Sequence, residues 1–124
     1  MSDLPGFKIF PDHAEYRPVA ELSRHEAFQL ITAVINHARG IQQQNLLLDI
    51  TGLTGFEPPG LGQRYFYIEE WARAARAYVR VAVVARSEMI DAHKFGVIVA
   101  ANNNFTTDVF TSVEKALAWL RGLP

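Results

Sequence analysis

A chain of 124 residues, of which 49% are hydrophobic and 20% charged, has the composition of one globular domain, so we expect residues 1–124 to fold around a single core. The net charge of −1 gives no reason to expect a nucleic acid as partner, and the absence of cysteine excludes disulfides and thiolate chemistry. Residues 1–8 lack the pattern of a secretory signal peptide and no apolar run approaches the ~20 residues that span a bilayer, so we expect a cytoplasmic location without a membrane span.

The first elements predicted along the chain are a hairpin and a helix. Phe7–Phe10 alternates apolar and polar residues, and Tyr16–Leu22 is a second extended segment, so the two are predicted to pair at the edge of a sheet. Ser23 and Glu26 have the spacing of a capping box, and apolar residues recur at helical spacing after them. A helix is therefore predicted to begin after Ser23 and to end at Gly40.

Three mostly apolar segments predict strands that are buried on both faces of a parallel sheet. These segments are Asn45–Ile50, Val79–Ala85 and Asp108–Phe110. Helical patterns accompany them over Leu61–Ala77, over Glu88–Asn102 and after a capping box at Thr111–Glu114. This alternation predicts an α/β domain with a mostly parallel sheet of four or five strands, the N-terminal edge hairpin and about four helices. Ligands and partners of such sheets usually meet the loops at the carboxyl ends of the strands.

The segment LLLDITGLTGFEPPGLG, Leu46–Gly62, resembles the central motif of STAS domains, the family of SpoIIAA-like anti-sigma-factor antagonists. In that motif an apolar strand leads into Asp-Leu-Ser-Gly-Val, three further residues and Asp-Ser-Ser-Gly-Leu-Gly. The residues that fall on the family's Asp, Ser, second Asp and Gly are Asp49, Thr51, Glu57 and Gly60. Pro58 falls on the serine that the family phosphorylates. The resemblance therefore implies a STAS-like fold without the phosphorylation switch, because proline has no hydroxyl group.

The C-terminal sequence RVAVVARSEMIDAHKF…DVFTSVEKALAWL is similar to a SpoIIAA-like subfamily that is related to STAS domains and to CRAL/TRIO lipid-binding domains. Together with the central motif, the resemblance extends over Leu22–Leu120. It implies an architecture more than a particular chemistry.

Polar loop residues are candidates for a binding site at the carboxyl ends of the strands. The candidates are Asp49, Thr51, Thr54, Glu57, Gly60, Arg86 and Asp91. Asp49 could orient a ligand hydroxyl group, or it could cap amides of its own turn through an Asx-type hydrogen bond. Thr54 is a hydroxyl in the same loop and so a candidate for a substitute phosphoacceptor.

The helix predicted over Leu61–Ala77 carries two apolar stripes. The stripe expected to face the core consists of Leu61, Tyr65, Ile68, Ala72 and Ala75. The other consists of Tyr67, Trp71, Ala74 and Tyr78. The second stripe lies roughly 90° around the helix from the first. It is expected either to form a partner surface with Arg64 at its rim or to be covered by a neighbouring helix or by the hairpin.

The helix predicted over Glu88–Asn102 is apolar nearly all round, which indicates burial on more than one side. Phe95 and Val99 lie on this helix and are interface candidates. Two arrangements account for such a helix. It could pack against its counterpart in a homodimer, or it could form, with the aromatic stripe, a groove for an acyl chain or another small apolar ligand.

No motif indicates a catalytic residue, a cofactor or a metal site. The four histidines lack zinc-binding spacing, and the glycines of the Thr51–Gly62 loop lack the spacing of a phosphate-binding loop. Asp91 is predicted to cap a helix, with His93 pointing away from it.

The leading functional hypothesis is a non-catalytic STAS-like interaction module, homodimeric, that contacts a protein partner through the Thr51–Gly62 loop and the face of Tyr67 and Trp71. The alternative is a carrier of a small apolar ligand or lipid. An enzyme whose site is formed by Asp49, Arg86 and Asp91 at the loop end of the sheet is the remaining alternative.

Overall fold

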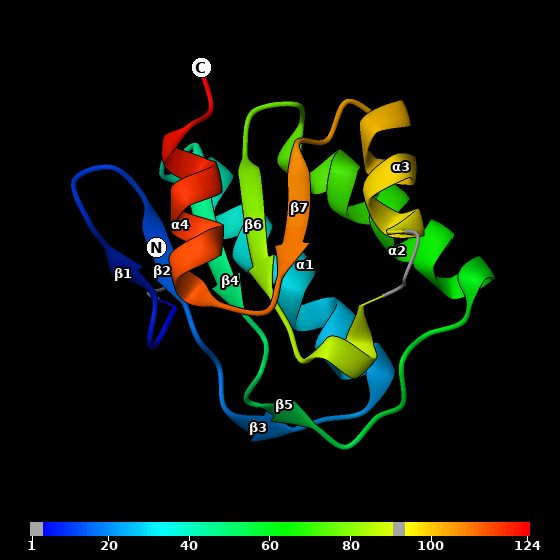
Figure 1. Ribbon diagram of the computed structural model, residues 1–124. Helices are drawn as coiled ribbons and strands as arrows, with labels where there is room; N and C mark the ends of the chain where they lie inside the picture. Colours follow the sequence, from blue (N-terminus) through cyan, green and yellow to red (C-terminus); the bar gives the residue numbers. More distant parts are fainter. Residues whose placement is uncertain (1–3, 91–93) are drawn as a thin grey trace.

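The computed structural model describes residues 4–90 and 94–124, and over them the chain forms an α/β structure built on a five-stranded sheet (Figure 1). In spatial order, the strands are β1 (Lys8–Ile9), β2 (Ala14–Tyr16), β4 (Asn45–Asp49), β6 (Arg80–Val84) and β7 (Thr107–Phe110). β1 pairs with β2 antiparallel, and every other pair of neighbours is parallel. The mostly parallel sheet and the hairpin at its edge confirm the predicted fold class.

Helices cover both faces of the sheet. In the described part of the chain they are α1 (Arg24–Gly40), α2 (Leu61–Ala75), α3 (Phe95–Asn102) and α4 (Val113–Arg121), with a short 3-10 turn, η1 (Ser87–Met89), after β6. α4 lies on one face, and α1, α2 and α3 lie on the other (Figure 1). β4, β6 and β7 all end at the same side of the molecule, where the loops that precede α2 and α3 begin (Figure 1). None of these helices is long and apolar enough to cross a membrane.

Alternate side chains of β4 enter two different cores, which explains its uninterrupted apolar sequence. Leu46 and Leu48 are buried in the core that the sheet forms with α1 and α2. Leu47 points to the opposite face, where it packs with Ala116 and Leu120 of α4. A strand with helices on both faces has no central position that favours a polar side chain, as the sequence predicts.

Two serines cap the helices that begin with a predicted capping box. Ser23 Oγ accepts a hydrogen bond from the Glu26 backbone N–H (3.1 Å), and Glu26 Oε1 accepts one from the Ser23 N–H (2.8 Å), which confirms the box before α1. In α4 the cap is Ser112, whose Oγ accepts from the Lys115 N–H (3.2 Å). The box predicted over Thr111–Glu114 is therefore wrong by one residue.

The second strand of the hairpin differs from the prediction. The sequence predicts it within Tyr16–Leu22, whereas the structure has it at Ala14–Tyr16. β2 has hydrogen-bonded neighbours on both sides, and Pro18 has no N–H to donate to either, so the strand ends before it. The chain then forms β3 (Ala20–Glu21), which pairs in parallel with β5 (Leu53–Thr54) as a separate small sheet beyond the strand ends (Figure 1).

Helix α3 is shorter than the predicted span of Glu88–Asn102. Residues 87–89 form η1, and α3 begins only after Lys94, whose φ of 49° is left-handed. A left-handed residue cannot continue a right-handed helix, so η1 and α3 are separate elements. The helix cap predicted at Asp91, and His93 beside it, lie outside the described residues.

A charged cluster connects the hairpin to α4. His13 is buried with Nδ1 2.6 Å from Asp12 Oδ1 and Nε2 2.7 Å from Glu15 Oε2. Arg121 Nε donates to Asp12 (2.9 Å), and Arg17 Nη2 donates to Glu15 (2.7 Å). Hydrogen bonds from His13 and Arg121 lower the pKa of Asp12 to about 2. Burial raises the pKa of Glu15, but the hydrogen bonds from His13 and Arg17 outweigh it and hold that pKa below its ordinary value of 4.5.

We expect this cluster to make the fold sensitive to acid. A carboxyl group whose pKa is lowered on folding contributes stability above its unfolded-state pKa, and the contribution is lost as the pH falls through the folded-state pKa. For Asp12 that window runs from its ordinary value of 3.8 down to about 2. Urea unfolding measured across this window should show a falling free energy of unfolding, and Asp12→Asn should make the fall shallower.

The control for this prediction is Ala118→Asn at an exposed position of α4, which adds no titratable group and should leave the pH dependence unchanged. If Asp12→Asn loses stability with acid as steeply as the unaltered chain, the cluster does not account for the acid sensitivity.

Candidate functional site

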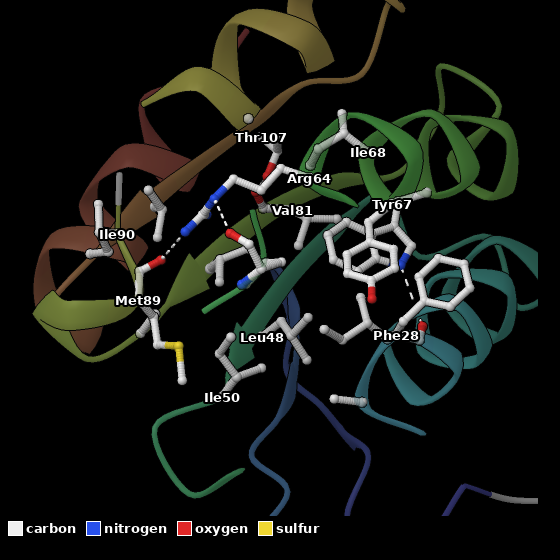
Figure 2. A pocket seen from close by; sticks show the side chains of 18 of the residues that line it. Phe28, Leu48, Ile50, Arg64, Tyr67, Ile68, Val81, Met89, Ile90 and Thr107 are labelled. Carbon is white, nitrogen blue, oxygen red and sulfur yellow. Dashed lines mark hydrogen bonds between the residues drawn. The ribbon is translucent and has the colours of Figure 1, made fainter. Parts of the chain in front are cut away.

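A cavity of about 170 Å³ lies between the sheet and the helices on its α1 face (Figure 2). The strand side of its lining is Leu48, Ile50, Val81, Val83, Ala85 and Val109. The helix side includes Ala27, Phe28, Ile31, Tyr67, Ile68, Trp71, Gly96 and Val97. Loops at the carboxyl ends of the strands contribute Phe56, Pro59, Met89 and Ile90. The lining is thus mainly apolar and comes from every element that packs on this face.

The size and lining of the cavity suit a small apolar group. An apolar cavity of roughly 150 Å³ holds benzene, and water is poorly retained where polar partners are few. A volume of about 170 Å³ therefore accommodates one ring of that size or a short alkyl chain. The hydroxyl of Thr107, which belongs to the lining, already donates a hydrogen bond to Val81 O (2.7 Å).

An aromatic cluster shared by α1 and α2 forms one wall. The rings of Phe28 and Tyr67 are stacked with centroids 4.6 Å apart, and the Trp71 ring lies 5.8 Å from Tyr67. Trp71 Nε1 donates a hydrogen bond to Thr32 Oγ1 (3.1 Å). Tyr67 and Trp71 therefore pack against α1, which is the second of the two arrangements expected for their stripe. Figure 2 shows Phe28 of α1 beside Tyr67.

Charged side chains also belong to the lining. They are Arg24, Arg64, Lys94 and Asp108. Lys94 Nζ lies 2.7 Å from Asp108 Oδ1, so these two opposite charges form an ion pair. The other two charged residues of this group are Arg24 and Arg64.

Both arginines bond to uncharged acceptors. Arg64 donates from Nε to Pro59 O (3.1 Å) and from Nη2 to Met89 O (3.4 Å), and Figure 2 shows its side chain reaching from α2 to Met89. Arg24 donates to Glu57 O from both Nε and Nη2 (3.3 Å each). Over residues 4–90 and 94–124, no carboxylate lies within 4 Å of either guanidinium group. The lining thus carries positive charge that the described residues do not neutralise.

The predicted loop candidates Asp49 and Thr51 lie together in one turn. Asp49 Oδ1 accepts hydrogen bonds from the Thr51 N–H (3.0 Å) and from Thr51 Oγ1 (2.7 Å). This is the Asx-type arrangement, so the carboxylate caps its own turn. Thr54 is exposed on β5, and Gly60 is the N-cap residue of α2.

Glu57 and Arg86 are the other loop candidates that the structure describes. The Glu57 side chain is exposed, and its backbone carbonyl is the acceptor for Arg24. Arg86 Nη2 donates to Leu53 O (3.3 Å) and so ties the loop after β6 to β5. These side chains bond to separate parts of the loops and form no common cluster with Asp49. Asp91 lies outside the described residues.

The remaining interface candidates have different surroundings. Val99 is 5% exposed and belongs to the interior, so its side chain is not on the surface. Tyr78 donates its hydroxyl hydrogen to Gln42 O (2.7 Å), in the turn after α1. Arg64 lines the cavity, and Phe95 is the first residue of α3.

Two residues predicted to face the core are exposed. Leu61 is 60% exposed and Tyr65 is 48% exposed, so the prediction is wrong for them, whereas Ala72 and Ala75 of the same stripe are buried as predicted. The first turns of α2 extend beyond the edge of the sheet, where no strand lies beneath them (Figure 1). Ile98 on α3 is also 55% exposed.

In comparisons with known proteins, no family model matches the chain and no curated protein matches it. The resemblance to STAS domains therefore stays a prediction. The fold class and the cavity are findings of the structure itself.

Several lining residues had no place in the sequence interpretation. Phe28 adjoins Ala27 on α1 but does not belong to the apolar residues that recur at helical spacing there, and Met89 and Ile90 fall at the start of the helix predicted over Glu88–Asn102. One feature of the sequence could have identified them. An apolar residue that lies outside the regular stripe of a helix indicates that the helix has a second apolar neighbour. The groove considered for α2 and α3 was based on that signal, but the contribution of α1 was not part of it.

Proposed function

We propose that the protein binds a small apolar ligand in the cavity between its sheet and helices α1, α2 and α3. The observation that carries the proposal is the cavity of about 170 Å³ with its mainly apolar lining. The pocket is partly open to solvent, and a mainly apolar surface of this kind holds water poorly, so an apolar ligand is its natural occupant. Its contact with the loops at the carboxyl ends of parallel strands is the usual position of a ligand site in such sheets. The resemblance predicted from the sequence, to a subfamily related to CRAL/TRIO lipid-binding domains, would agree with this function.

Ligand affinity should depend on the apolar area that the cavity removes from water. Each buried methylene group contributes about 0.8 kcal/mol, so affinity for a series of linear alcohols should rise with chain length until the cavity is full. The stacked rings of Phe28 and Tyr67 provide a rigid wall that does not have to reorganise on binding.

Filling the cavity with a side chain should prevent binding. Val97 lines the cavity, and its neighbour Ile98 on the same helix does not and is exposed. Val97→Phe is expected to weaken 1-octanol binding by about tenfold or more, a loss of about 1.4 kcal/mol, because the new ring occupies the ligand volume. Ile98→Phe adds the same ring on the outside and should leave the affinity unchanged. Titration calorimetry on the three proteins measures both effects.

Native mass spectrometry of the freshly purified chain complements the titration, since a resident ligand would add its mass. Circular dichroism is the check that both variants are folded. The proposal fails if folded, unaltered protein binds neither 1-octanol nor benzene, or if Val97→Phe binds 1-octanol as well as the unaltered chain does.

A second function, that of a STAS-like homodimeric interaction module, is favoured by exposed apolar side chains on α2 and α3. They are Leu61, Tyr65, Phe66 and Ile98, with exposures between 48% and 60%. Large apolar side chains gathered on neighbouring helices are typical of protein interfaces. With Pro58 in place of a phosphoacceptor, such a module would associate without phosphorylation.

Sedimentation equilibrium tests the second function. A homodimer has a mass near twice 13.9 kDa. Tyr65→Glu is expected to shift the equilibrium toward the monomer, because it places a charge in the middle of the exposed apolar surface. Ala118→Glu, at an exposed position of α4 on the other face of the sheet, is the control. A monomer mass at every concentration of the unaltered chain would remove this function.

A further inference from the structure

The charged residues of the cavity indicate what else its ligand carries. We propose that the ligand is a small carboxylic acid with an apolar tail, which lies with the tail in the cavity and the carboxylate on the guanidinium group of Arg64. This inference rests on the proposed function, since it concerns the same cavity.

The balance of charge in the lining favours an anion. The whole chain has a net charge of −1, yet among the described residues the lining carries three basic side chains and one acidic one. The negative charge of Asp108 is neutralised by its ion pair with Lys94 (2.7 Å). Arg24 and Arg64 bond to backbone carbonyls, and no described carboxylate is within reach of them. A negatively charged ligand therefore fits the cavity better than a neutral one of the same shape.

Arg64 is held in place for this task. Its Nε–H and one N–H of Nη2 are used by Pro59 O and Met89 O, which fix the guanidinium plane between the loop before α2 and the loop after η1. A guanidinium group has five N–H donors, so three remain for a ligand. A carboxylate matches this planar arrangement with two parallel hydrogen bonds, and a positioned arginine loses little side-chain entropy on binding.

The low polarity of the cavity strengthens this interaction. Apart from the charged residues, the lining is mainly apolar, and the Thr107 hydroxyl group is already hydrogen-bonded to Val81. A charge-assisted hydrogen bond is stronger beside such a surface than in water, because the effective dielectric constant is lower. The head group of the ligand is thus selected by charge and its tail by volume.

The experiment compares octanoate with 1-octanol, which share an alkyl chain and differ in the head group. By titration calorimetry at neutral pH, octanoate is expected to bind about tenfold tighter or more than 1-octanol. Arg64→Gln should remove that advantage, so that octanoate and 1-octanol bind the variant with similar affinity. Arg73→Gln is the matched control, because Arg73 lies exposed on the same helix, pairs with Glu70 and is not part of the lining.

A second measurement needs no variant. The carboxyl carbon of ¹³C-labelled octanoate reports its own protonation by NMR, in the free and in the bound state. A neighbouring guanidinium group stabilises the carboxylate and lowers the pKa of the bound ligand below that of free octanoate, whereas an apolar site without a cation raises it. The sign of the shift therefore decides whether the head group lies beside a basic side chain of the cavity or in an apolar part of it, even if Arg64→Gln does not fold.

The outcomes separate the two proposals. If 1-octanol binds, Val97→Phe prevents it, and octanoate binds no tighter or has a raised pKa, the cavity function stands and the carboxylate inference is overturned. If neither compound binds to the folded chain, both are overturned. Tighter octanoate binding that Arg64→Gln removes and Arg73→Gln preserves supports both.

Discussion

Replacing Trp71 by alanine is expected to lower the free energy of unfolding by about 3 kcal/mol and to leave the sedimentation mass unchanged. The Trp71 ring packs on Phe28 and Tyr67, and its Nε1–H bonds to Thr32 Oγ1 (3.1 Å). Removing the indole leaves a void between α1 and α2 and takes a donor from the Thr32 hydroxyl. The loss is placed at the lower end of the range for a large aromatic residue, because Trp71 is partly exposed.

Urea unfolding and sedimentation equilibrium, measured on the same samples, test this expectation. Tyr65→Ala is the control, since Tyr65 is 48% exposed on the same helix and its truncation should change stability by only about 0.5 kcal/mol. A Trp71→Ala chain with unchanged stability but a lower mass would show that Trp71 anchors a partner instead of the α1–α2 contact.

The sequence predicted an element correctly where its local pattern matches its environment in the folded chain. The run Leu46–Leu48 is apolar because its side chains alternate between two cores, and the capping box at Ser23 forms as its spacing predicts. β3 and β5 were not predictable, since each has two residues and is defined by its partner across the fold.

The site was less predictable because periodicity gives the face of a helix but not what lies under it. Tyr65 and Ile68 belong to one stripe by spacing, yet Tyr65 is exposed while Ile68 packs against the core, because the start of α2 extends past the sheet. Tyr67 and Trp71 belong to the other stripe, and α1 covers them through Phe28. Residues of both stripes line the cavity, and that follows from how α1 packs against α2, which no local pattern encodes.

From the motif, the sequence interpretation selected polar residues of the Thr51–Gly62 loop as site candidates. In the structure, apolar residues of this loop line the cavity. Asp49 and Thr51 bond to each other, and Phe56 and Pro59 from the same loop line the cavity. Proline also fixes backbone angles before a helix, which suits a loop that holds a cavity wall. The position of this loop depends in turn on its pairing with residues 18–22.

Gly55 follows β5 directly, and the β3–β5 pairing leaves no room for a side chain at this position. Its φ is +102°, and a Cβ atom there would lie 2.7 Å from Leu22 O and 2.9 Å from Glu21 Cγ. Gly55→Ala is therefore expected to lower the free energy of unfolding by about 3 kcal/mol, because it combines an unfavourable backbone conformation with contact against a backbone oxygen that cannot move without breaking the β3–β5 pairing. Urea unfolding measures the loss.

Gly62→Ala is the matched control for this substitution. Gly62 lies in the first turn of α2, where an added Cβ atom meets nothing within 4 Å, so alanine should be neutral or stabilise by about 0.4–1 kcal/mol. Because Gly55 precedes Phe56 and lies four residues before Pro59, Gly55→Ala should also displace part of the cavity lining and weaken 1-octanol binding at temperatures where the chain remains folded. A Gly55→Ala chain that is as stable as the unaltered one would show that the loop can shift away from β3, and the cavity wall would then not depend on this pairing.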